Sequence, residues 1–282
     1  MTRCRNEPYL REFVDHYLGE GVDEIHIIDD DSRAGLYDDV RRNPRVRIVT
    51  DIPFSGDSMG GGLTALYGRI REDFDWIVNV DVDEYITTRR NAAHTLRDEL
   101  LTTFRDADCI KIPWVMMAFN GIETNPDLLL ETNVYRWNHD LRHGPASKQG
   151  KLRCRYEEIE VKCVFRTASF ESCWDHGPVY DGSRAVRAVD GVHGRAASLL
   201  HAGLPSDPYY ANLRERDIAQ AALLCFHFRV VSRQQCVDKT TGSHIRGYRA
   251  MSAEDLMACD FPEVIDDTLR LKSRLRRTRQ AP

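Results

Sequence analysis

The sequence predicts an α/β fold with a mostly parallel sheet that carries helices on both faces. Helix-like and strand-like segments alternate over residues 7–86, which is typical of strand–helix–strand units. Two of the strand-like runs, at 24–29 and 76–80, end in clusters of carboxylates. The chain has 282 residues, of which 42% are apolar and 29% charged, so it is long enough to bury a sizeable core.

The first half of the chain supplies its elements in a regular order. The expected elements are a helix at 7–20, strands at 24–29 and 46–49, a helix at 63–71 and a strand at 76–80. The Gly-rich loop at 55–62 lacks the lysine of a phosphate-binding loop, and we interpret it as a hinge. Only residues 1–4 precede the first helix, where such a sheet ordinarily begins with a strand. Either this strand is very short, or the chain as given starts late.

The second half continues the alternation after one irregular stretch. Apolar periodicity weakens over 120–156, where Asn, Gly, Pro, Lys and Arg accumulate. A loop of this length inside a compact domain is usually functional or mobile. The expected elements are helices at 92–104, 210–222, 232–239 and from 265 onward, and strands at 109–117, 161–166 and 223–231.

Bulk composition excludes several classes of protein. The net charge of −5 gives no general attraction to nucleic acid. No apolar stretch approaches the length of about 20 residues that spans a bilayer, and residues 1–13 contain no signal-peptide core. The eight cysteines form no C-x-x-C pair, so we expect reduced thiols in a cytoplasmic protein and no zinc site.

The acidic end of the strand at 76–80 is the strongest chemical signal. Asp81, Asp83 and Glu84 follow a buried run, and the carboxyl edge of an open α/β sheet is where ligands bind. Residues two apart share one face of a strand, so Asp81 and Asp83 are predicted to point the same way. Paired carboxylates suit Mn²⁺ or Mg²⁺, which in turn suits a diphosphate. The alternative is an ordinary turn or helix cap.

Several short motifs recur in an order that resembles a known family. They are Arg5-Asn6-Glu7, Asp29-Asp30-Asp31-Ser32, Asp81-Val82-Asp83-Glu84-Tyr85, Lys162 with Arg166, Asp175-His176-Gly177, and His227. Together they resemble the glycosyltransferases of the GT-A fold, and more narrowly the family-2-like branch related to family 92. The resemblance spans about residues 3–245. The sequence departs from the family pattern at Thr167, where the family has proline, and at Phe228, where it has tyrosine.

The resemblance implies a role for each motif. Nucleotide binding would fall to Asn6, Glu7, Asp29, Asp30, Asp31 and Asp81. The divalent metal would be held by Asp81, Asp83 and His176, whereas Glu84 would support the loop. Phosphate or acceptor contacts would come from Lys162, Arg166 and His227. The implied enzyme is a metal-dependent, inverting glycosyltransferase that moves a sugar from a nucleotide sugar, such as a UDP-sugar, to a glycan or another hydroxyl acceptor, including a lipid-linked or protein acceptor.

The chemistry of such a transfer adds one candidate from the residues themselves. A nucleoside diphosphate leaving group needs charge neutralisation, which metal and cationic side chains supply. An inverting transfer also needs a base near the acceptor hydroxyl. Asp175 is the candidate, because a carboxylate beside Trp174 can lie against a sugar face.

The same residues leave other arrangements open. A phosphotransferase or nucleotidyltransferase also places acids at strand ends, and a degenerate transferase-like domain would bind glycans without turnover. We expect one domain over 1–282, with a nucleotide-binding half (1–119), an acceptor-side half (120–245) and a basic helical tail (246–282). The Arg-rich tail allows a peripheral contact with the inner membrane face, although a solvated helix face explains it as well.

Overall fold

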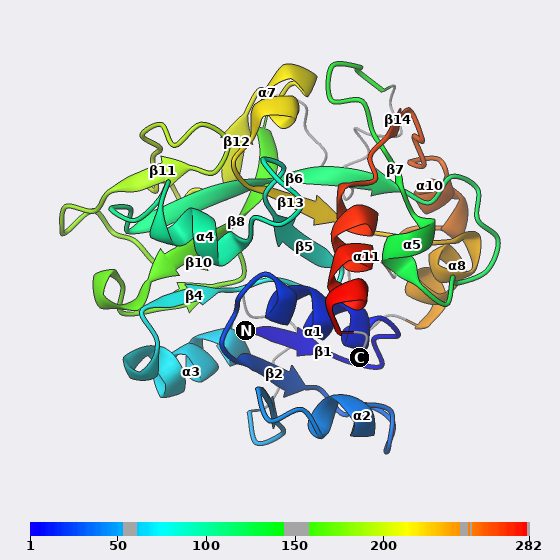
Figure 1. Ribbon diagram of the computed structural model, residues 1–282, viewed down its shortest axis with the longest axis horizontal. Helices are drawn as coiled ribbons and strands as arrows, with labels where there is room; N and C mark the ends of the chain where they lie inside the picture. Colours follow the sequence, from blue (N-terminus) through cyan, green and yellow to red (C-terminus); the bar gives the residue numbers. More distant parts are fainter. Residues whose placement is uncertain (53–60, 144–157, 243–247, 249, 281–282) are drawn as a thin grey trace.

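A computed structural model gives the fold of the whole chain (Figure 1). The structure describes every residue except 53–60, 144–157, 243–247, 249 and 281–282. Most of the predicted Gly-rich hinge and the second half of the predicted 120–156 loop therefore lie outside the described residues.

The N-terminal part alternates as the sequence predicts. Its elements are β1 (Thr2–Cys4), α1 (Leu10–Gly19), β2 (Ile25–Asp29), α2 (Asp38–Arg41), β3 (Val46–Val49), α3 (Gly61–Ile70), the 3₁₀ turn η1 (Arg71–Asp73), β4 (Trp76–Val78), β5 (Glu84–Thr87) and α4 (Leu96–Leu101). The first strand is short, with three residues, which is the first of the two possibilities that the sequence leaves open. It pairs in parallel with β2, and β2 pairs in parallel with β3.

The C-terminal part contains both the longest strands and the longest helix of the described residues. Its elements are β6 (Cys109–Ala118), α5 (Leu129–Thr132), β7 (Tyr135–Arg136), β8 (Glu158–Arg166), the 3₁₀ turn η2 (Thr167–Ser169), β9 (Cys173–Trp174), β10 (Gly177–Pro178), β11 (Ala188–Asp190), β12 (Tyr209–Ala211), α7 (Glu215–Gln220), β13 (Leu224–His227), α8 (Arg233–Gly242), α10 (Ala253–Met257), β14 (Val264–Ile265) and α11 (Thr268–Gln280). The predicted helix at 210–222 is wrong in its first part. Residues 209–211 instead pair with β8, and Asn212 then turns the chain with a φ of 56°.

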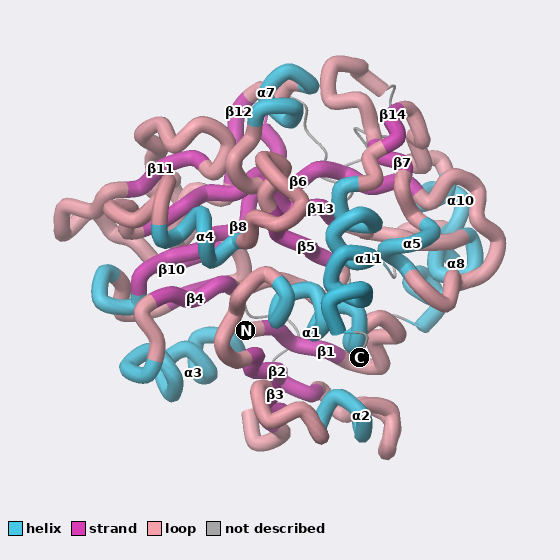
Figure 2. The backbone as a smooth tube through the Cα atoms, in the orientation of Figure 1, coloured by secondary structure: helices cyan, strands magenta, loops and turns pink. Residues whose placement is uncertain are grey.

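The larger sheet is built mainly from antiparallel pairs, so the prediction of a mostly parallel sheet is not confirmed. Strand β6 runs through its middle, antiparallel to β8 and β7 and parallel to β11 and β13. Parallel neighbours need a crossover of about a dozen residues or more, usually a helix. Helix α1 supplies such a crossover between β1 and β2, and the segment with α2 supplies one between β2 and β3. Later strands reverse direction through turns and loops, which gives antiparallel pairing (Figure 2).

Strand β6 changes its pairing partner partway along its length. Strand β6 pairs with β8 up to Pro113 and with β13 from Trp114 onward. The segment that runs from β4 to β5 makes the same change: β4 pairs with β8, and β5 pairs with β13. Residues 79–83, with the predicted metal ligands, lie in the interval between these two pairings.

The basic C-terminal helix α11 packs against the protein in Figure 1. Lys272 and Arg276 both bind Glu20 at the end of α1, and Glu20 is fully buried. Arg274 and Arg277 both bind Glu131 on α5. Lys272, Arg274, Arg276 and Arg277 thus form ion pairs that hold the helix to the fold.

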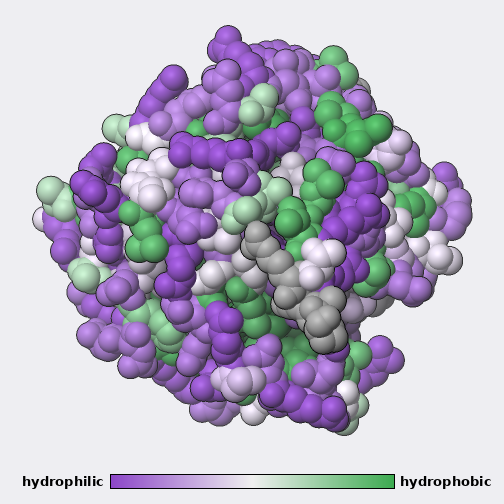
Figure 3. Space-filling view, in the orientation of Figure 1, coloured by the Kyte–Doolittle hydropathy of each residue, from purple (hydrophilic) through white to green (hydrophobic). Residues whose placement is uncertain are grey.

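The surface of the described chain is mostly polar on the face shown in Figure 3, with apolar side chains scattered between polar ones. No helix among the described residues combines the length and apolar character that a membrane crossing requires. The side chains of α1, β5, β6 and β13 form the largest part of the core, and a second apolar cluster lies between α3, β8 and β9.

Candidate functional site

Two of the three predicted metal ligands, Asp81 and Asp83, lie in a tight turn between β4 and β5. The Glu84 N–H donates to the Asp81 carbonyl oxygen at 3.1 Å, which closes the turn. The prediction that Asp81 and Asp83 share one face of a strand is therefore wrong, because residues 81–83 are not in a strand. Glu84 is fully buried, and its Oε2 accepts the Asp81 N–H at 2.7 Å. This agrees with the expectation that Glu84 supports the loop.

A buried lysine pairs with the first carboxylate of this turn. Lys162, which is 2% exposed, places its Nζ 2.9 Å from Asp81 Oδ2 and 3.2 Å from Glu84 Oε2. Burial opposes ionisation of Asp81, but the Lys162 ammonium outweighs it and lowers the pKa of that carboxyl. For Glu84, burial dominates and raises the pKa well above its usual range. Asp81 is therefore the charged partner of Lys162.

A second lysine pairs with the next carboxylate. Lys239 on α8 places its Nζ 3.3 Å from Asp83 Oδ2, and His227 Nε2 lies 3.7 Å from Asp83 Oδ1. Burial nevertheless raises the pKa of Asp83, against the pull of Lys239, and the nearby Asp81 charge adds to this. The acidic turn therefore holds two lysine–carboxylate pairs, Lys162 with Asp81 and Lys239 with Asp83.

The loop after β1 lies close to the acidic turn. Burial raises the pKa of Glu7 to about 7, although Lys239 counteracts it. The neighbouring Asn6 joins two loops, since its N–H donates to Ser32 Oγ at 2.9 Å and its side chain accepts the Arg33 N–H at 2.9 Å. Asn6 thus positions the loop that brings Glu7 to the turn.

The acidic group after β2 divides into separate roles. Asp29 accepts the Ser32 N–H at 3.1 Å and pairs with Arg41 at 3.0 Å, so it closes a local turn. Asp30 faces Arg5 at 3.5 Å, and its buried Oδ2 accepts no hydrogen bond. Asp31 is exposed and has a φ of 58°. Of the three, Asp30 is placed best to meet a ligand.

The Trp174-Asp175-His176 turn completes the site from the other side. Asn79 donates to the Trp174 carbonyl at 2.8 Å, and Lys162 donates to the Asp175 carbonyl at 3.0 Å. The Asp175 carboxylate lies 3.7 Å from Arg3. Burial raises the pKa of Asp175 above its usual value, although Arg3 counteracts it. His176 Nδ1 lies 3.0 Å from the Val161 carbonyl, which favours the proton on Nδ1 and the lone pair on Nε2.

The sheet register explains why residues so far apart in sequence meet here. Lys162 pairs with Ile112, two residues before Trp114, so Lys162 and Trp114 share one face of the sheet. His227 pairs directly with Glu84, which places these two side chains on a common face. The Trp114 ring lies 4.2 Å from the His227 ring and 5.8 Å from the His176 ring, measured between centroids. An aromatic row therefore joins the two lysine–carboxylate pairs.

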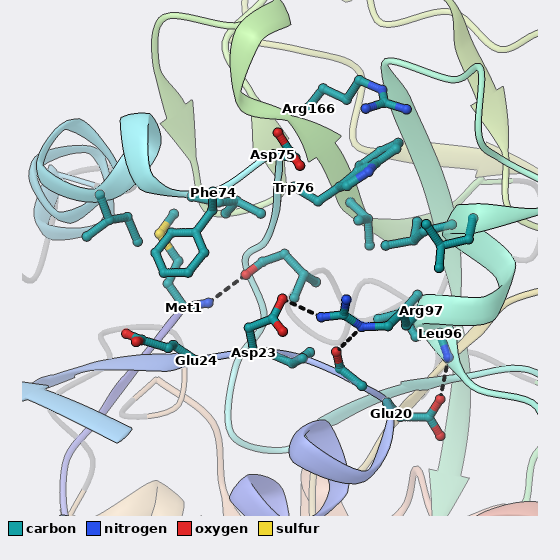
Figure 4. Close-up of a pocket in the computed structure, with 18 of the residues that line it drawn as sticks. Met1, Glu20, Asp23, Glu24, Phe74, Asp75, Trp76, Leu96, Arg97 and Arg166 are labelled. Carbon is teal, nitrogen blue, oxygen red and sulfur yellow. Dashed lines mark hydrogen bonds and ion pairs between the residues drawn. The ribbon is translucent and has the colours of Figure 1, made fainter. Parts of the chain in front are cut away.

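One predicted site residue lies elsewhere. Arg166 donates to the Ala107 carbonyl at 3.0 Å and stacks on Trp76 at 4.3 Å from the ring centroid. It lines a cavity of about 330 Å³ at the start of β2 and β4, shown in Figure 4. Lys162 lies deeper along β8, toward the opposite end of β4. The structure therefore separates the predicted pair of Lys162 and Arg166.

Sequence reasoning missed three residues of this site. Arg3, Trp114 and Lys239 carry no motif of their own, and their contacts join segments more than 100 residues apart. Of the three, Lys239 had a signal in the sequence. It lies in the predicted helix that directly follows the strand with His227, and side chains of such a helix lie near the end of that strand. Nothing in the local sequence marks Trp114, since it lies in a uniformly apolar run.

The residues present fit a divalent cation that a diphosphate helps to hold. Among the described residues no three His, Cys, Asp or Glu side chains converge as a ready-made metal cage. Mg²⁺ commonly binds through one or two carboxylates together with substrate phosphates and water. Asp81 and Asp83 are 43% and 27% exposed at the side chain, so both are accessible. Burial first, and then the charge of neighbouring carboxylates, raise the pKa values of Asp83 and Glu7, and a bound cation would lower both again.

Comparison with known proteins gives a match to a family model and a distant similarity to a solved structure. Residues 65–194 match the model of glycosyltransferase family 92, a range that contains Asp81, Asp83, Lys162 and Asp175. No curated protein matches the sequence. The fold is similar to the crystal structure of S. aureus TarS 1-349 in complex with UDP-GlcNAc, with 15% identity and a TM-score of 0.37 over 70% of this chain and 60% of that chain. The resemblance to glycosyltransferase family 92 that the sequence motifs predict is confirmed over residues 65–194.

Proposed function

We propose that this protein transfers a sugar from a UDP-sugar to a hydroxyl acceptor, with Asp81 and Asp83 holding a divalent metal on the diphosphate. The observation that carries the proposal is the convergence on one acidic turn of residues from both ends of the chain. Glu7, Lys162, Asp175, His227 and Lys239 all lie around Asp81 and Asp83. The family match supports glycosyl transfer, and the donor and the metal are part of the proposal.

The charges of the site suit a diphosphate leaving group. Mn²⁺ or Mg²⁺, when bound, would neutralise charge on the diphosphate as its bond to the sugar breaks. Lys162 and Lys239 lie beside the two carboxylates and place two positive charges next to the proposed position of the diphosphate. Preorganised cations of this kind stabilise developing charge without reorganisation during the reaction.

Asp175 is the proposed base. In an inverting transfer, the base takes the proton of the acceptor hydroxyl while its oxygen forms a bond to the anomeric carbon. The bond from that carbon to the diphosphate oxygen breaks, and the electron pair leaves with UDP. A carboxylate whose pKa is raised by burial is a stronger base, which favours this role for Asp175. Arg3 at 3.7 Å keeps the carboxylate oriented.

Product analysis tests this function against its nearest alternative. The full chain is incubated with Mn²⁺ and, separately, with UDP-glucose, UDP-galactose and UDP-N-acetylglucosamine. Slow transfer of the sugar to water releases UDP and free sugar, and we expect this for at least one donor. A phosphotransferase or nucleotidyltransferase would instead release UMP and sugar phosphate, or inorganic phosphate.

The outcomes separate the candidate functions. Release of UMP or phosphate would contradict glycosyl transfer and favour the phosphate chemistry. Glycan binding without any nucleotide binding would favour a transferase-like domain that has lost turnover. The D83N variant serves as the background control, because it removes one proposed metal ligand and leaves the Lys162–Asp81 pair in place.

A further inference from the structure

Two neighbouring ring nitrogens inside the site have no hydrogen-bond partner among the described residues. They are the indole N–H of Trp114 and the Nδ1 atom of His227, in residues that are 4% and 5% exposed. A buried tryptophan usually finds an acceptor for its N–H, and an unpaired buried polar group is costly. Such groups in a folded protein call for a specific explanation.

The two atoms belong to rings in contact. The ring centroids of Trp114 and His227 lie 4.2 Å apart, at an interplanar angle of 49°. Both residues are on adjacent strands of one sheet, β6 and β13, which pair in parallel with Trp114 opposite Cys225. The two unpaired atoms therefore belong to neighbouring rings, and the simplest bound group is one that reaches both.

The chemistry of that group follows from the two atoms. Trp114 Nε1 can only donate a hydrogen bond. His227 Nε2 lies 3.7 Å from Asp83 Oδ1, which favours the proton on Nε2 and leaves a lone pair on Nδ1. The missing group must accept from the indole and donate to the imidazole. A hydroxyl does both, whereas a phosphate oxygen only accepts.

The location indicates which hydroxyl this is. His227 is beside Asp83, and the aromatic row continues through His176 toward Asp81. In the proposed reaction these two carboxylates hold the diphosphate, and the transferred sugar is bonded directly to it. A hydroxyl of the donor sugar is therefore the nearest group that can accept from the indole and donate to the imidazole.

We propose that Trp114 and His227 recognise the transferred sugar, with one of its hydroxyls accepting from Trp114 Nε1 and donating to His227 Nδ1. This inference rests on the proposed function and adds a sugar-recognising pair to it. It predicts that the protein distinguishes a UDP-sugar from UDP through these two rings.

The test compares two matched tryptophan variants of the full chain. Trp114→Phe keeps an aromatic ring and removes only the indole N–H region. Trp137→Phe makes the same change at a tryptophan that is also 4% exposed with an unpaired Nε1, but whose ring packs on Phe261 at 4.9 Å. Melting temperatures of both variants show whether each still folds. Binding of UDP and of the UDP-sugar that the wild type binds best is then titrated in Mn²⁺.

We expect W114F to bind the UDP-sugar about 5- to 30-fold more weakly than the wild type, as for the loss of one buried hydrogen bond. Its affinity for UDP should change less than about twofold, and W137F should match the wild type for both ligands. Unchanged UDP-sugar affinity in a folded W114F, or an equal loss for UDP and UDP-sugar, would overturn the inference while leaving the proposed function standing. Failure of the wild type to bind any UDP ligand would overturn the proposed function and the inference together.

Discussion

Lys162 and Asp81 form an ion pair at 2.9 Å across 81 residues of sequence. The lysine is buried and belongs to a strand of the sheet, whereas the aspartate lies in a partly exposed turn. This pair fixes the position of the acidic turn relative to the sheet. Lys162 also gives the site a positive charge that is present without a bound metal.

Replacement of Lys162 by methionine should affect both stability and nucleotide binding. The change leaves Asp81 and the buried Glu84 without their cation, and breaking a buried pair costs about 3 kcal/mol or more. Urea unfolding measures the loss of unfolding free energy, and UDP titration in Mn²⁺ measures the loss of affinity. We expect the variant to bind UDP at least about tenfold more weakly, because the turn loses its anchor.

The control for this variant is Lys111→Met. Lys111 is 3% exposed and pairs with Asp207 at 2.8 Å, outside the candidate site. It should lose comparable stability and still bind UDP normally at a temperature where it is folded. Equal UDP affinities for the two folded variants would refute a binding role for Lys162.

Asp175→Asn should slow the reaction without weakening donor binding. Asparagine keeps the shape of the side chain and cannot take a proton, and removal of a general base typically lowers the rate by about 10²–10⁴-fold. The measurement is kcat for UDP release together with the UDP affinity. The exposed Asp181→Asn is the control and should keep its full rate. Full turnover by D175N would assign the base elsewhere.

The C-terminal helix should loosen in acid because of His16. Burial first, and then the Arg276 charge, lower the pKa of His16 to about 3, so the folded protein keeps this histidine neutral. In the unfolded chain it binds a proton below about pH 6.5. The unfolded state thus gains protons first, and stability falls as the pH drops from about 6.5 toward 3, by up to about 1.4 kcal/mol per unit.

Urea unfolding at pH 7 and pH 5 checks this, with His16→Gln as the test variant. Glutamine can still donate to the Ile86 carbonyl, which His16 contacts at 2.9 Å, and it does not titrate. We expect H16Q to lose less stability than the wild type between the two pH values. The exposed His201→Gln should behave like the wild type. If H16Q and wild type show the same pH slope, the neutral-histidine explanation does not hold.

Local patterns predicted most elements of this fold but not the direction in which strands pair. The run at 76–80 and the acids after it were predicted from the sequence because an apolar segment ends there in a cluster of carboxylates. The turn that separates Asp81 from Asp83 was not predictable, since it forms where β4 and β5 pair with different strands. Trp114 was invisible for a related reason: its role depends on contact with His227, and that contact arises from the register of β6 and β13.

We propose that Asp81 and Asp83 bind a metal–diphosphate. Titration calorimetry of UDP measures this binding directly. The wild type, D83N and the exposed-site control D181N are each titrated with UDP, once with Mn²⁺ and once with a chelator. The account predicts that Mn²⁺ raises the UDP affinity of the wild type and D181N by at least about tenfold, and that D83N loses this gain. Equal UDP affinity with and without Mn²⁺ in the wild type, or a full Mn²⁺ effect in D83N, would contradict it.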